Sequence, residues 1–190
     1  MFATRVMTLL GRRSIATVLA LVALATPLVY EAYMRSVAAT FEIRAFSRDL
    51  SDPRRLAGFA DDVFVGRVEG EGRFYDLDST VNRTVFPVRV LEVLKGDVPS
   101  ADILVNQVGG EDQYGNVWRI EGVPMLQPSE TYLFATRSSG DDFLGETATP
   151  GVGHTLLASD DQRRRLVRRF RDAIQSAIPY DVPNPARSDR

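Results

Sequence analysis

The side chains of this sequence that could do chemistry include one histidine, three adjacent acidic pairs and a few aromatic residues. His154, between Gly153 and Thr155, could act as a base or as a metal ligand. The chain has no cysteine and no second histidine, so a zinc site would need carboxylates for all its other protein ligands. The sequence therefore predicts no catalytic residue, no cofactor and no metal, and a structural or exposed role for His154.

Adjacent carboxylates could hold a calcium ion in a surface loop. The pairs are Asp61-Asp62, Glu111-Asp112 and Asp141-Asp142. Asp76 and Asp78 also have the i, i+2 spacing of calcium loops, but nothing matches the complete twelve-residue pattern. Because Asp is common in turns, we expect these residues to lie in solvated turns.

Two glycine-rich stretches and the serines lack the context that catalysis or nucleotide binding requires. Gly109-Gly110 and Gly151-Val152-Gly153 do not fit either phosphate-binding glycine motif, and no G-x-S-x-G nucleophile motif is present. A hydrolase would have to assemble its site around His154 from residues that converge only in the folded chain. Such a hydrolase is an alternative hypothesis.

Aromatic side chains in or near the expected loops could line a ligand groove. Tyr75, Tyr114 and Trp118, together with His154, are the candidate groove residues. The competing interpretation is that these rings close one end of a barrel, because large aromatics commonly fill small cores.

The C-terminal region predicts an amphipathic helix over residues 159–178. Ser159 and Gln162 form a capping box, and the apolar positions recur every four residues at Leu166, Phe170, Ile174 and Ile178. The candidate membrane or partner contacts on it are Arg163, Arg164, Arg168 and Arg169. Three interpretations are open: packing on the chain's own body, lying on an anionic membrane, or contacting a partner protein. Residues 179–190 are expected to be a disordered tail.

An apolar segment near the N-terminus predicts where the chain is placed. Residues 14–34 follow Arg5, Arg12 and Arg13 and are predicted to be a transmembrane signal anchor, with residues 1–13 cytoplasmic and 35–51 a juxtamembrane segment. Ala23-Leu24-Ala25 would also suit a signal-peptidase site, which would make the protein secreted. A buried helix of a cytosolic protein is the third reading.

Composition limits what the remaining part can do. From Thr40 onward the chain carries 19 basic and 24 acidic residues, a net charge of −5, which argues against nucleic-acid binding. About 150 residues follow the anchor, enough for one domain with its own core. Without cysteine, no disulfide can support that core.

The body, residues 52–158, predicts five or six short strands separated by Gly and polar turns. Alternating or apolar strand patterns occur at 62–69, 81–94, 103–108, 117–120, 131–136 and 151–157. Asp52 and Pro53 are typical of the start of a short helix. The expected fold is mainly β in the α+β class: a transmembrane helix, a small OB-like β-barrel and a C-terminal amphipathic helix.

The order of these pieces resembles a group of extracytoplasmic bacterial proteins with a netrin-like, metalloproteinase-inhibitor-like OB-fold domain. The resemblance covers roughly residues 56–157 and rests on the runs ADDVFVGRV, VLEVLKG, ILVNQVGG, GVPMLQPSETYLFA and DDFLGETATPGVG. These are markers of a fold and not of an active site. The metalloproteinase inhibitors that share this type of domain act through an N-terminal cysteine that chelates the protease metal. This chain has no cysteine, so the resemblance implies the fold without that mechanism.

The sequence thus predicts a membrane-anchored extracytoplasmic binding or structural module of a bacterial cell envelope. The expected partners are the membrane, through residues 14–34, and a protein or glycan of the envelope. A protease inhibitor or regulator, and a hydrolase built around His154, are the alternatives.

Overall fold

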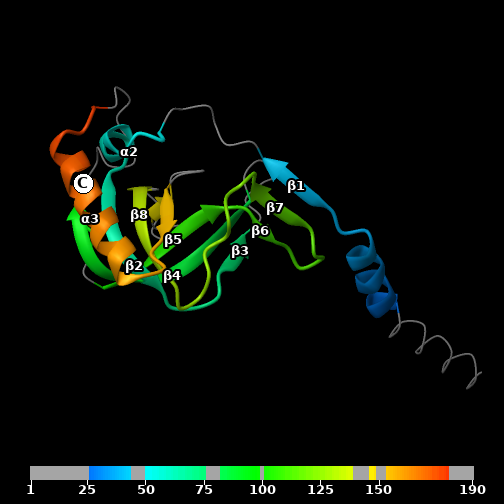
Figure 1. The fold of residues 1–190 in the computed structure, drawn as a ribbon. Coiled ribbons are helices and arrows are strands. Elements are labelled where there is room, and N and C mark those ends of the chain that lie inside the picture. The colour runs from blue at the N-terminus through cyan, green and yellow to red at the C-terminus, as the bar shows by residue number, and fades with distance from the viewer. Residues whose placement is uncertain are drawn as a thin grey trace, which may run out of the picture. The chain divides into compact units, whose positions relative to one another are not determined.

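A computed structural model of the chain describes residues 26–43, 50–75, 82–98, 101–138, 146–148 and 153–179. Its strands and helices are, in order, β1 (Thr40–Ile43), α2 (Pro53–Phe59), β2 (Asp62–Val68), β3 (Arg73–Tyr75), β4 (Arg83–Lys95), β5 (Asp102–Val108), β6 (Gly110–Glu111), β7 (Val117–Ile120), β8 (Thr131–Ser138), β9 (Glu146–Ala148), β10 (His154–Leu156) and α3 (Asp160–Gln175) (Figure 1). Strands predominate over helices in these residues, which confirms the mainly β, α+β class.

The described residues form two compact units: 26–39 with 113–116, and the rest from Thr40 onward. In the first unit residues 26–36 are helical, and Arg35 pairs with Glu31 one turn earlier, with 3.0 Å between Nη2 and Oε1. Within the described residues, no helix combines the length and the apolar character needed to cross a membrane. Residues 1–25, which hold most of the predicted anchor, lie outside the described part.

The main sheet of the second unit curls into a half-barrel (Figure 1). Its strands follow the order β10-β8-β2-β4-β5-β9, with antiparallel pairing except between β5 and β9. The short strand β9 pairs with β5 on one side and with β8 on the other. The curl therefore brings the two sides of the sheet to a common strand.

Strand β4 is long because it serves two neighbours in turn. Along one edge its first residues pair with β3 and its residues from Val88 onward pair with β2. Pro87 lies between these two stretches, where its missing N–H costs no ladder bond, and its carbonyl accepts from Glu69 N at 2.9 Å. The sequence predicts an edge or a bulge at Pro87; the structure instead places it where β4 changes partner.

Strand β2 is buried on both faces and so separates two hydrophobic cores. Val63 and Val65 face the first core, which includes Val167 and Phe170 of α3. Phe64 alternates with them and packs in the second core, where its ring stacks on Phe134 at 5.1 Å. Because successive side chains of a strand point to opposite faces, the apolar sequence of β2 fits this double burial.

Helices α2 and α3 begin as the sequence predicts. Asp52 caps α2 by accepting from Arg54 N at 2.9 Å, and Ser159 caps α3 by accepting from Gln162 N at 3.3 Å. The predicted C-terminal helix ends at Gln175 instead of residue 178. The backbone leaves the helix there, and Ile178 N donates to Arg54 O of α2 at 3.1 Å. Of the predicted tail, only Pro179 is described.

The second compact unit, which begins at Thr40, also contains a sheet of three strands in the order β1-β7-β6. The sequence alternates apolar Phe41, Ile43 and Ala45 with polar Glu42 and Arg44, which predicts a strand over residues 40–46. The structure forms it as far as Ile43, where Thr40–Ile43 pairs in parallel with Val117–Ile120. Residues 44–46 lie outside the described part. The segment predicted as a juxtamembrane connection therefore contributes an edge strand to the body.

Candidate functional site

The aromatic candidate Trp118 is held in a stack of three rings. It lies in β7 with the Phe41 ring at 5.1 Å and the Phe74 ring at 5.7 Å, both near parallel to the indole. The indole is half-buried, whereas Phe41 of β1 keeps 46% of its surface exposed. Trp118 thus joins β1, β3 and β7, which is a packing role.

The two candidate tyrosines lie in other surroundings. Tyr75 ends β3, half-buried, with the Arg73 guanidinium 5.3 Å above its ring. Tyr114 is half-buried in residues 113–116, which belong to the other compact unit. Trp118, Tyr75 and Tyr114 thus have different surroundings in the described part of the chain.

His154 begins β10 and lies against a different set of side chains. Its Nε2 is 3.1 Å from the Pro124 carbonyl oxygen and 3.5 Å from Gln107 Nε2, and the Tyr132 ring meets it edge-on at 5.8 Å. Burial lowers the pKa of His154, an effect that the hydrogen bond to Pro124 partly opposes. The neutral His154 ring donates from Nε2 to the Pro124 carbonyl, and this bond fixes its position in the fold.

Gln107 is the polar residue here that the sequence reading missed. Its side chain is buried; Oε1 accepts from Leu126 N and Nε2 donates to Pro124 O, both at 2.9 Å. These bonds hold the loop before β8. A glutamine inside the apolar strand ILVNQV was the available signal, because buried polar groups need partners. We call Gln107, Pro124, Leu126, Tyr132 and His154 the Gln107 cluster.

The acidic pair Asp61-Asp62 does not lie in a solvated turn as expected, because Asp62 is the buried first residue of β2 and Asp61 is half-buried. Asp62 is buried and accepts from Asp97 N at 2.9 Å, while Asp61 accepts from Ser138 N at 3.3 Å. Glu111 ends β6. In the described residues no three His, Cys, Asp or Glu side chains gather as metal ligands would. Asp76, Asp78 and Asp141-Asp142 lie outside the described part.

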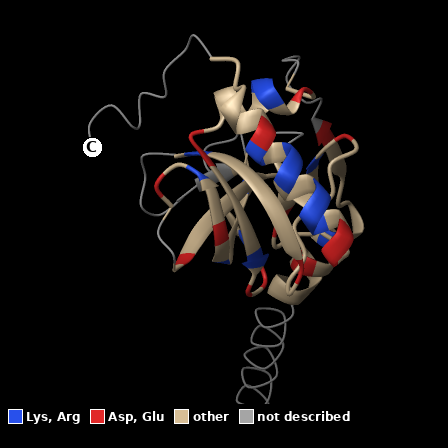
Figure 2. Cartoon of the chain, turned by 60° about the vertical axis from the view of Figure 1, so that its left-hand side comes forward, with Lys and Arg blue, Asp and Glu red and all other residues tan. Residues whose placement is uncertain are grey.

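Helix α3 separates its apolar and basic residues cleanly. Val167, Phe170 and Ala173 are buried against the body, so the packing interpretation of the helix is confirmed. The remaining surface carries arginines along the length of the helix (Figure 2). They are Arg163, Arg164, Arg165, Arg168, Arg169 and Arg171. With three aspartates, the helix has a net charge of +3, against −2 for the whole chain.

A hollow of about 460 Å³ lies between α3 and β4, and we call it the arginine groove. Four arginines and two carboxylates line it, a net charge of +2; these are Arg163, Arg164, Arg168, Arg171, Glu92 and Asp172. Val167 contributes an apolar surface. Three of the four arginines predicted as contact residues line this groove, whereas Arg169 does not.

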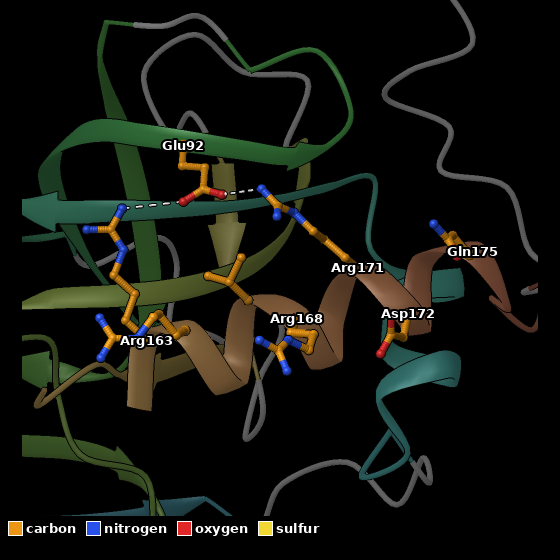
Figure 3. A pocket seen from close by; sticks show the side chains of 8 residues that line it. Glu92, Arg163, Arg168, Arg171, Asp172 and Gln175 are labelled. Carbon is orange, nitrogen blue, oxygen red and sulfur yellow. Dashed lines mark hydrogen bonds and ion pairs between the residues drawn. The ribbon is translucent and has the colours of Figure 1, made fainter. Parts of the chain in front are cut away.

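Glu92 of β4 draws two of these arginines together (Figure 3). Its Oε1 accepts from Arg171 Nη2 at 2.8 Å, and its Oε2 lies 3.4 Å from Arg163 Nη2. Elsewhere along the groove, Arg164 pairs with Asp161, both well exposed. Among the described residues, Arg168 has no ion-pair or hydrogen-bond partner.

The sequence reading missed Arg171 and Glu92. Arg171 follows Arg164 by seven residues and Arg168 by three, so helical spacing alone places it beside them. Glu92 could not be found that way, because it comes from a strand about 70 residues earlier and reaches α3 only through the packing of the helix on the sheet.

Comparison with known proteins yields no match for this chain, either among protein-family models or among curated proteins.

Proposed function

We propose that this protein is a membrane-anchored, extracytoplasmic binding module of a bacterial cell envelope, and that it binds anionic ligands at the basic face of α3. The arginine groove carries the proposal. The apolar contacts that dock the helix come from Val167, Phe170 and Ala173, while its arginines lie on the other side of the helix or at its edge. A net positive charge around a hollow of ligand size would allow such a module to bind an anion.

An OB-like barrel is the scaffold that we propose for this surface. The pairings β2-β4, β4-β5, β5-β9, β9-β8 and β8-β2 link five strands in a ring. A five-stranded, partly open barrel of short strands is the OB architecture. The curl of the sheet and this ring support the resemblance to netrin-like domains. Helix α3 packs on the outward face of this sheet.

The proposed placement rests on the N-terminal sequence. An apolar stretch follows three arginines, and basic residues preferentially stay on the cytoplasmic side of a membrane. The folded body would then face the exterior. A C-terminal epitope tag on the full chain tests this: externally added protease should remove it from intact spheroplasts, and a protected tag would overturn the placement.

Binding is favoured over catalysis by the surroundings of His154. Its neighbours in the described chain are a ring, an amide and a carbonyl. A general base or nucleophile-activating histidine is usually oriented by a carboxylate and aimed at a second reactive group. The described geometry gives the hydrolase alternative no such support.

The experiment that tests the binding surface uses a polyanion. The full chain in neutral detergent should be retained on a heparin column at low salt, because a basic face attracts polyanions despite a negative net charge. Arg165→Gln/Arg168→Gln/Arg169→Gln should elute at clearly lower salt. The matched control Arg55→Gln/Arg67→Gln/Arg89→Gln removes the same charge elsewhere and should elute like the wild type. Equal behaviour of the two variants would overturn the proposal.

A further inference from the structure

We propose that the arginine groove binds a phosphate monoester, and that the phosphate displaces Glu92 from between Arg163 and Arg171. This inference rests on the proposed function, since it uses the same face of α3. It adds the chemical class of the ligand and the internal group with which the ligand competes.

Glu92 already occupies the position of an anion. It comes from β4 and offers one oxygen to each of two arginines that are eight residues apart on α3. Arginines so far apart on a helix converge only because both long side chains turn toward the same carboxylate (Figure 3). A ligand oxyanion that takes this position meets two guanidinium groups that already point to it.

The carboxylate leaves the guanidinium groups incompletely used. The 3.4 Å separation between Arg163 Nη2 and Glu92 Oε2 is longer than the 2.7–2.9 Å typical of a charge-assisted hydrogen bond. Each guanidinium has five N–H donors, whereas a carboxylate brings one charge and two oxygens. A phosphate monoester brings up to two charges and three terminal oxygens, a better match for two arginine forks.

The charge and the volume of the groove also favour a phosphate monoester. With Glu92 displaced, the four arginines of the lining face only Asp172, a net charge of +3, so a dianion is favoured over a monoanion. Arg168, exposed and without a partner in the described chain, also lines the groove. The volume of about 460 Å³ exceeds that of a bare phosphate and fits a phosphate with a small organic group attached.

A phosphate monoester can be free or can be the headgroup of a lipid, and the experiment separates the two sources. Full-length protein in neutral detergent is dialysed against labelled glycerol phosphate. Unlabelled competitors are glycerol phosphate itself, micelles doped with phosphatidic acid, and micelles doped with phosphatidylglycerol, whose phosphate is a diester with one charge. We expect the first two to displace the label and phosphatidylglycerol to displace it at least about tenfold less well. Phosphatidic acid competing more strongly than free glycerol phosphate would identify the lipid as the source.

The variants Glu92→Gln and Asp172→Asn test the displacement itself. Both carboxylates line the groove, and each change raises its net charge by one. Only Glu92 bonds the arginines that the phosphate needs, so we expect Glu92→Gln to tighten binding about tenfold and Asp172→Asn to change it about twofold or less. Arg163→Gln/Arg171→Gln should abolish binding while α3 stays folded by circular dichroism.

Three outcomes would overturn the inference: no monoester binding, equal displacement by phosphatidylglycerol, or the same affinity for Glu92→Gln and Asp172→Asn. In each case the heparin experiment still decides the proposed function separately. If the triple arginine variant loses heparin retention while any of these outcomes occurs, α3 is an anion-binding face without a phosphate site.

Discussion

The arginine groove and the Gln107 cluster both gather polar side chains from distant parts of the chain, but they use them differently. In the cluster, the buried amide of Gln107 is bonded to the backbone at both of its ends. In the groove, four arginines face two carboxylates and leave a net charge of +2 at the surface. In the cluster the Gln107 amide is paired within the fold, whereas the groove keeps an excess of arginine N–H donors at the surface.

The difference follows from the environment of each region. A buried polar group left unpaired costs about 1–3 kcal/mol, so a fold that buries Gln107 must pair it internally. Exposed arginines remain hydrated and carry no such cost, and an exposed ion pair contributes only about 0–1 kcal/mol. Internal pairing therefore indicates a structural role for the cluster, whereas the net positive charge of the groove is what the proposed binding role rests on.

The largest effect should come from removing the support of the groove. Phe170→Ala deletes a buried ring between α3 and the sheet and should lower the free energy of unfolding by about 3–5 kcal/mol, measured by urea denaturation. Retention on heparin should fall with it at temperatures where the helix undocks. The adjacent exposed residue gives the control, since Arg169→Ala should change stability by about 0.5 kcal/mol or less. Equal stabilities for the two variants would mean that α3 does not depend on this packing.

A smaller effect is expected in the cluster. Gln107→Leu keeps the size of the side chain but leaves Leu126 N–H without its acceptor, which should cost about 1–3 kcal/mol in urea denaturation. Gln127 lies in the same loop with an exposed side chain, and Gln127→Leu should cost little. Anion binding should be unchanged in both folded variants. A loss of anion binding in Gln107→Leu would break the separation between the two regions.

The elements of the fold could be predicted because their signals are local. The caps at Asp52 and Ser159 and the four-residue apolar repeat of α3 are fixed by residues within a turn or two of each other. The end of α3 was missed because it depends on a bond from Ile178 to α2. That contact joins residues more than 120 positions apart, and no pattern near Ile178 contains it.

The candidate site was predicted only on its helical side for the same reason. Arg163, Arg164 and Arg168 follow from the composition of one helix, whereas Glu92 enters through the packing of that helix on β4. The aromatic groove stays a prediction; in the described residues Trp118 contacts Phe41 and Phe74, while His154 belongs to the Gln107 cluster.

The pH dependence of stability should distinguish the cluster from the groove. Burial lowers the pKa of folded His154 below the unfolded value of 6.5, so the unfolded chain binds more protons in the window between the two values. Stability should therefore fall as the pH drops through 6.5 toward the folded pKa. His154 is the only histidine, and unpaired carboxylates titrate near 4. In His154→Gln, thermal denaturation between pH 7.5 and 5.5 should show less of this loss; an unchanged pH profile would contradict the burial of the neutral ring.

Glu92→Gln should have a small effect on stability, although Glu92 has the most ion-pair contacts in the groove. Its side chain is 28% exposed, and its partners Arg163 and Arg171 are 38% and 61% exposed, so water screens both pairs. Removing the charge should change the free energy of unfolding by about 1 kcal/mol or less, measured in urea.

This outcome bears directly on the role of the contact between Glu92 and α3. If Glu92 is a structural clamp for α3, its loss should approach the cost of Gln107→Leu and weaken anion binding as the helix loosens. If Glu92 occupies the binding position of a ligand anion, Glu92→Gln should barely change the free energy of unfolding and should raise the anion affinity. A small stability change together with tighter binding separates a contact that holds the fold from one that a ligand displaces.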